Sequence, residues 1–176
     1  GVVTRIEAFL ESLKNYKQDI FRGDRREIIA KTISANLAGS AVKRTLYIPY
    51  MGDASFGIAA CLRGYGQPAE VMPVADEATL MRGRAYTTGK ECLPCAITSG
   101  EMLKVLERDG VKPENTAFFM PGASGPCRFG LYHCMQKLVL KHAGVDGAVI
   151  FSPNQDSSFY SHFAKNFNGS GSVTFI

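Results

Sequence analysis

Several features that define common protein classes are missing from this sequence of 176 residues. No apolar run approaches the roughly 20 residues that a membrane-spanning helix needs, and no apolar stretch near the start precedes a signal-cleavage pattern. We therefore expect a soluble, cytoplasmic protein without a membrane partner. Its hydrophobic content of 45% is enough for one domain with a substantial core.

The chain also lacks a large excess of either charge, since its net charge is only +4. Residues 1–44 contain nine Lys or Arg and five Asp or Glu, whereas residues 45–176 contain eleven of each kind. The whole excess therefore lies in the first quarter of the chain. Since no basic stripe alternates with aromatic residues, we do not expect a nucleic-acid partner.

The motifs of nucleotide and zinc sites are absent as well. The glycine-rich stretch at residues 121–126 (PGASGP) matches neither G-x-G-x-x-G nor G-x-x-x-x-G-K-[ST], which argues against a nucleotide site. There is no second C-x-x-C pair and no H-x-x-x-H spacing, so a four-ligand zinc site is not favoured. Five cysteines, an odd number, do not suggest a disulfide framework in a chain of this size.

The patterns that are present predict an α/β domain over residues 44–176. Short strand candidates alternate with helical segments, which indicates a parallel sheet covered on both faces, a three-layer αβα fold. The expected strands are 45–50, 69–72, 116–120 and 147–151, and the expected helices are 53–64, 76–84, 94–108 and 127–143.

The first 43 residues form a separate N-terminal helical segment in this interpretation. Apolar residues at helical spacing predict an amphipathic helix over residues 3–17. A capping box at Asp24 and Glu27 begins a second helix, which Gly39 ends. Because the chain starts at Gly1 without Met and stops after a strand-like run, we expect it to be a piece of a longer protein.

Three of the thiols stand where a loop runs into a predicted helix. Cys92 and Cys95 form a C-x-x-C pair in residues 89–95 (GKECLPC), and Cys127 lies in residues 125–130 (GPCRFG). The positive end of a helix dipole favours the thiolate, which ligates iron or zinc or attacks a disulfide. Three thiolates can hold an iron-sulfur cluster if the two loops meet, whereas a dithiol redox pair and a structural role remain alternatives.

The roles of two basic residues and of the remaining two cysteines are predicted from their residue types and their neighbours. Lys90 and Arg128 could complement an anionic ligand or a cluster of negative charge. The alternative is a surface arginine at position 128 and, with equal weight, a solvated lysine at position 90. Cys61 and Cys134 sit among apolar helical residues and are predicted to be core residues. In a parallel sheet, the loops at residues 50–53, 121–126 and 152–154 should lie at the carboxyl edge.

Three ordered motifs carry a resemblance to a known family. Residues 46–53 (LYIPYMGD), 89–92 (GKEC) and 119–132 (FMP through GPCRFGLY) resemble the large CoA-enzyme-activase proteins related to 2-hydroxyacyl-CoA dehydratases and the benzoyl-CoA reductase activators. The resemblance covers roughly residues 44–155. It implies a flavodoxin/Rossmann-like domain that holds a 4Fe-4S cluster in an anaerobic enzyme system, with Cys92 and Cys127 at the positions of the family cysteines and Cys95 less firmly matched.

The same resemblance implies partners rather than an independent activity. Proteins of this kind join an ATP-hydrolysing activator region to regions similar to dehydratase subunits, and these 176 residues contain no counterpart of that activator. We therefore expect low-potential electron transfer, with other domains of the parent protein as partners, and leave association with a second copy open. The alternatives are a non-catalytic scaffold with structural cysteines and a domain that binds CoA or another anionic ligand.

Overall fold

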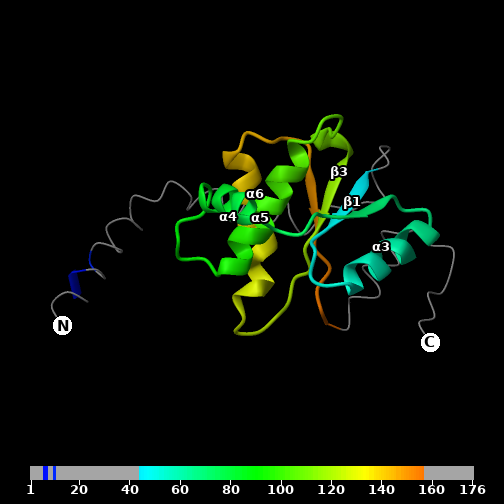
Figure 1. Ribbon diagram of the computed structural model, residues 1–176. Helices are drawn as coiled ribbons and strands as arrows, with labels where there is room; N and C mark the ends of the chain where they lie inside the picture. The colour runs from blue at the N-terminus through cyan, green and yellow to red at the C-terminus, as the bar shows by residue number, and fades with distance from the viewer. Residues whose placement is uncertain (1–5, 8–9, 11–43, 157–176) are drawn as a thin grey trace. The chain divides into compact units, whose positions relative to one another are not determined.

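The computed structural model describes residues 6–7, 10 and 44–156 (Figure 1). The chain divides into two compact units, Gly1–Ile33 and Ser34–Ile176. In the first unit, residues 6, 7 and 10 are helical, in agreement with the helix predicted over residues 3–17. The other residues of that helix, the helix predicted from Asp24 and the strand-like run at the end of the chain lie outside the described residues.

A four-stranded parallel sheet forms the centre of the second unit. Its strands run in the order β2-β1-β3-β4, with bounds Ala69–Val71, Thr45–Ile48, Thr116–Phe119 and Val149–Phe151. This is the order of a flavodoxin-like doubly wound sheet as far as it extends, with β1 and β3 at the point where the strand order reverses. The predicted α/β class and all four predicted strands are confirmed.

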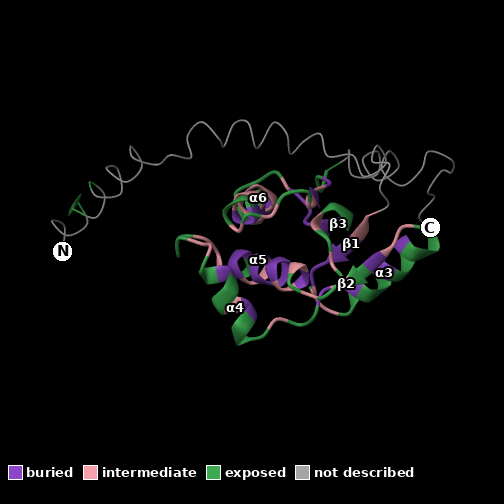
Figure 2. Cartoon of the chain, turned by 90° about the horizontal axis from the view of Figure 1, so that it is seen from above, coloured by how far each residue is buried: buried purple, intermediate pink, exposed green. Residues whose placement is uncertain are grey.

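Helices cover both faces of this sheet, as Figures 1 and 2 show. Helix α3 (Ala54–Gly64) lies on one face, and α5 (Leu93–Leu106) and α6 (Tyr132–His142) lie on the other. Helix α4 (Glu77–Arg84) packs against α5 on its outer side. In the described part of the chain, none of these helices combines the length and the apolar character that crossing a membrane requires.

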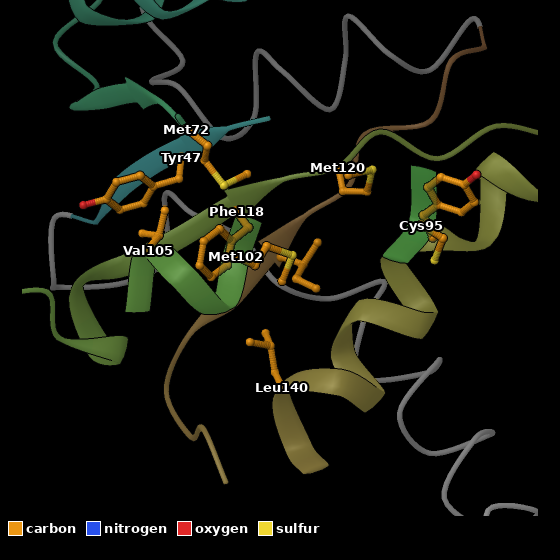
Figure 3. Packing of buried hydrophobic residues seen from close by; sticks show 10 residues of the cluster. Tyr47, Met72, Cys95, Met102, Val105, Phe118, Met120 and Leu140 are labelled. Atoms are coloured by element: carbon orange, nitrogen blue, oxygen red, sulfur yellow. The ribbon is translucent and has the colours of Figure 1, made fainter. Parts of the chain in front are cut away.

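The alternation of side chains along the strands divides the core into two clusters. On β1, Leu46 and Ile48 point into the cluster under α3, and Tyr47 points into the cluster under α5 and α6. On β3, Phe119 joins the α3 cluster and Phe118 the opposite one. Figure 3 shows the second cluster, with Tyr47 at one end and Cys95 at the other. The thiol site is therefore built on the end of a packed core.

Close backbone contact holds α4 against α5. A side chain at Gly83 would overlap the carbonyl oxygen of Ala96, and one at Gly100 would overlap that of Thr79. Asp76 caps α4 by accepting from the backbone N–H of Thr79 at 2.7 Å, and it also pairs with Lys104 of α5 at 2.9 Å. These contacts lower the pKa of Asp76, the hydrogen bonds with Thr79 and Lys104 being the main causes.

The structure differs from three local expectations. Cys61 is exposed, not part of the core, because α3 buries Ser55, Ala59 and Leu62, and Cys61 lies on the opposite side of the helix. The helix predicted from Cys127 begins instead as a 3-10 turn, η2 (Arg128–Leu131), and becomes α-helical only at Tyr132. Cys134, also predicted to be core, is half-buried.

Candidate metal centre at the carboxyl edge of the sheet

The loops that follow β3 and β4 meet at the carboxyl edge, as the parallel topology predicts. The N–H of Gly122 donates to the carbonyl of Pro153 at 2.9 Å, and the N–H of Gln155 donates to the carbonyl of Gly122 at 2.9 Å. A Cβ at Gly122 would lie 2.7 Å from Oδ1 of Asn154, so the side chain of Asn154 would have to shift to accept it. This pairing fixes the start of the segment that leads to Cys127.

The segment that carries the C-x-x-C pair reaches α5 through a short ordered turn. Gly89 has a φ of 81°, which L side chains rarely adopt. Glu91 accepts hydrogen bonds from the backbone N–H of Thr88 at 2.9 Å and from its hydroxyl at 3.0 Å. Cys92 is then the N-cap of α5, with Pro94 in the first turn, where a missing N–H costs nothing.

The segment that carries Cys127 is fixed by a second glycine contact. Cys127 precedes η2, and its carbonyl accepts from the N–H of Gly130 at 3.3 Å. A side chain at Gly130 would overlap the carbonyl oxygen of Ala123, so only glycine allows the turn to fold back this closely. The turn leaves Cys127 exposed at the rim of the edge.

A hydrogen bond joins the two cysteine segments directly. Nη1 of Arg128 donates to the carbonyl oxygen of Lys90 at 2.7 Å, across 38 positions of sequence. A second hydrogen bond joins the two helices that follow these segments: Nε2 of Gln136 on α6 donates to Oγ1 of Thr98 on α5 at 3.0 Å. The requirement that the two loops meet is therefore satisfied in the structure.

All three predicted thiols lie close enough to Tyr132 to affect its hydroxyl. Burial and a hydrogen bond with Cys92 raise the pKa of Tyr132 to about 12, and the charges of Cys92, Cys95 and Cys127 contribute in the same direction. Tyr132 is 7% exposed and belongs to the same buried cluster as Cys95, against which Cys92 packs. Tyr132 therefore lies in the same part of the molecule as the three thiols.

Cys95 is the most buried of the three, at 2% exposure. Burial raises the pKa of its thiol to about 11, and the negative charges of Glu91 and Cys92 add to this shift. A hydrogen bond with Ser99 and the positive charge of Arg128 act in the opposite direction. Without a metal, this thiol is neutral at pH 7, which is unfavourable for dithiol exchange because the thiolate is the nucleophile.

The predicted site residues contribute to the site in different ways. The segments that carry Cys92, Cys95 and Cys127 are joined, because Arg128 of one segment donates to the backbone of the other. Lys90 is exposed and contributes its backbone carbonyl to that tie. In the part of the chain that the structure describes, no three His, Cys, Asp or Glu side chains are placed to hold a single metal ion.

Sequence reasoning did not identify Tyr132 as part of this site. Its ring is held by an edge-on contact with Phe129, with ring centroids 5.3 Å apart. The available signal was its place five residues after Cys127, within the motif at residues 125–132. A tyrosine at the start of an amphipathic helix is normally interpreted as core packing.

Comparison of the chain with protein-family models, with curated proteins and with solved structures finds no match in any of the three.

Proposed function

We propose that Cys92, Cys95 and Cys127 hold a 4Fe-4S cluster, and that the domain transfers low-potential electrons within a system of the 2-hydroxyacyl-CoA dehydratase type. The observation that supports this most directly is the meeting of two distant cysteine segments, tied by Arg128 and grouped around one tyrosine. The CoA-ester chemistry comes from the motif resemblance alone. The other domains of the parent protein, including its ATP-hydrolysing region, are the proposed electron-transfer partners.

The donor set fits such a cluster chemically. Thiolates are the ligands that iron-sulfur clusters take from proteins, and three of them leave one iron for an external ligand. A cluster binds each thiolate at a different iron, so its ligands stand further apart than the ligands of a single ion. When bound, the cluster supplies one-electron storage at low potential.

The surrounding residues have the charges that such a site needs. Cys92 stands at the N-terminus of α5, where the helix dipole favours a negatively charged ligand. The guanidinium of Arg128 lies close enough to Cys95 to favour its thiolate. Burial of Cys95 and Tyr132 keeps water from the inner side of the site, whereas the exposed Cys127 leaves the outer side open to a partner.

One observation favours the scaffold alternative. Cys95 packs in the buried cluster together with Met102, Met120 and Phe118, as a core residue does. On this interpretation the domain is a metal-free docking module, and its binding to a partner does not depend on Cys92 or Cys127. A domain that binds CoA or another anion through Lys90 and Arg128 would likewise be free of iron and would be stabilised by the ligand.

Iron and sulfide analysis under anaerobic conditions tests the proposal. The protein, purified without oxygen and reconstituted, should contain about four irons and four sulfides per chain and show a broad visible absorption band. Cys92→Ala and Cys127→Ala should lose this iron. Cys61→Ala is the matched control, because Cys61 is exposed on α3 and should not affect iron content. A colourless, folded wild-type protein after reconstitution would refute the cluster and favour the scaffold.

A further inference from the structure

Strand β2 lies at one edge of the sheet, so in the part of the chain that the structure describes one side of its backbone has no neighbouring strand. Its inner side is identified by a bond with β1, in which the N–H of Leu46 donates to the carbonyl of Pro68 at 2.8 Å. Because successive peptide groups of a strand point in opposite directions, the N–H and C=O groups of Ala69 and Val71 point away from β1. These are the groups that a further strand would bind.

Arg63, in the last turn of α3, already occupies one of these outward groups. Its Nη1 donates to the carbonyl oxygen of Ala69 at 2.8 Å. Helix α3 runs beside β2 (Figure 2), which brings this exposed arginine to the edge of the sheet. The bond satisfies the outward acceptor and places a positive charge where the next strand would lie. A strand added at this edge would have to displace the guanidinium.

The other end of the β2 edge is limited by a proline. Pro73 lies two residues after Val71 and has no N–H, so the next outward donor along the chain is missing. No described residue pairs with the outward N–H and C=O of Val71 through its backbone. Prolines and charged side chains are common means by which edge strands avoid pairing with other chains. On β2 these two means stand at the two ends of the same short edge.

We propose that Arg63 closes the β2 edge to strand addition, and that without it two copies of this chain pair along β2. A second copy fits this edge because strand addition is held by main-chain hydrogen bonds, and two identical strands in antiparallel orientation are self-complementary. Since β2 has only three residues, such pairing depends on each outward group and requires a free carbonyl at Ala69. The inference is independent of the thiols and of the proposed function.

The test is Arg63→Met in the full chain, which keeps a long side chain and removes the donor and the charge. Arg128→Met is the matched control, because it is the same substitution and also removes one bond to a carbonyl, away from β2. Each loses a single hydrogen bond, so both variants should stay folded. Arg63→Lys keeps the charge and can still donate. Sedimentation at increasing protein concentration gives the association constants, and hydrogen exchange gives the protection of residues 69–71.

We expect Arg63→Met to associate at least about tenfold more strongly than Arg128→Met, because pairing satisfies a carbonyl that otherwise has no partner. Residues 69–71 should exchange more slowly as the concentration of Arg63→Met rises, and Arg63→Lys should behave like the wild type. Equal association of the two methionine variants would overturn the proposal. So would association of Arg63→Met without protection of residues 69–71, or pairing of the wild type along these residues to the same degree.

Discussion

On the α3 side of the sheet, the buried cluster consists of hydrocarbon side chains alone, from Leu, Ile, Ala and Phe. On the opposite side, the cluster under α5 and α6 contains Met72, Met102, Met120 and Cys95 together with two tyrosines. The buried Glu101, Ser99 and Gln136 belong to the helices of this second side as well. Apart from Ser55 of α3, the buried polar side chains of the helices lie on the side that carries the thiol site, together with the buried sulfur atoms.

The two sides of the sheet therefore differ in the kinds of atoms that they bury. A hydrocarbon core stabilises through buried area and tolerates few polar atoms, whereas the other side accepts polar groups whose burial is costly. Four measurements test this distinction between the two sides of the sheet.

The largest effect is expected from helix glycines. Gly100→Ala should destabilise the domain by about 3 kcal/mol, because the new methyl group overlaps the carbonyl of Thr79 and forces α4 away from α5. Gly57→Ala on α3 should stabilise it by up to about 1 kcal/mol, since nothing lies within 4 Å of the new atom and alanine favours helix. Urea unfolding of both variants measures this. Equal effects would contradict the close α4–α5 contact.

Glu101 should make stability depend on pH. Burial raises the pKa of this carboxyl to about 7, from an ordinary value of 4.5. Because the folded state then holds the proton more tightly than the unfolded chain, this group's contribution to stability is full below pH 4.5 and is lost as pH rises through 7. The total loss is about 3 kcal/mol.

Glu101→Gln tests this, because glutamine keeps the shape and cannot ionise. The variant and the wild type should have similar unfolding free energies at pH 4.5, and the variant should be the more stable at pH 8. Unfolding in urea across this range measures the difference. The α3 sequence contains no acidic residue, so no similar term arises on that side. A difference that does not change with pH would show that Glu101 is charged in the folded protein.

Thiol reactivity should also differ between the two sides. In the metal-free folded protein, Cys95 should react with iodoacetamide at least about a hundredfold more slowly than in the unfolded chain, because a pKa near 11 rather than 9 leaves a hundredfold less thiolate. Cys61 on the outer side of α3 is exposed and should lose little reactivity on folding. Mass spectrometry of alkylated peptides gives both rates. Fast labelling of Cys95 in folded protein would contradict its burial.

The smallest effect on stability is expected from two arginines that each donate to one carbonyl. Arg63→Met removes the bond from α3 to Ala69, and Arg128→Met removes the bond to Lys90. Each should cost about 1 kcal/mol or less. Of the two variants, only Arg128→Met should speed hydrogen exchange in residues 88–95, because the bond of Arg63 does not reach the C-x-x-C segment. Identical exchange in both variants would show that the two cysteine segments are held together by other contacts.

Much of the fold follows from local patterns. All four strands and the helices α3, α4 and α5 lie where the apolar spacing and the Gly and Pro signals place them, within about three residues at each end. The start of α6 does not, because the turn at Gly130 depends on a contact with Ala123 that no local pattern encodes. The side of α3 that faces the sheet was also misjudged at Cys61, since an almost uniformly apolar helix gives no clear polar side.

The residue order alone predicted the alternation of strands and helices, and from that the parallel sheet and the loops at its carboxyl edge. It also identified Cys92, Cys95 and Cys127 as the thiols of interest, because each stands near a helix start. The contact of the two segments through Arg128 and Lys90, and the burial of Tyr132 in the same cluster as Cys95, are visible only in the folded chain. The reason is physical: helix and strand preferences act over a few residues, whereas these contacts join residues about 40 positions apart and form only when both helices pack on one sheet.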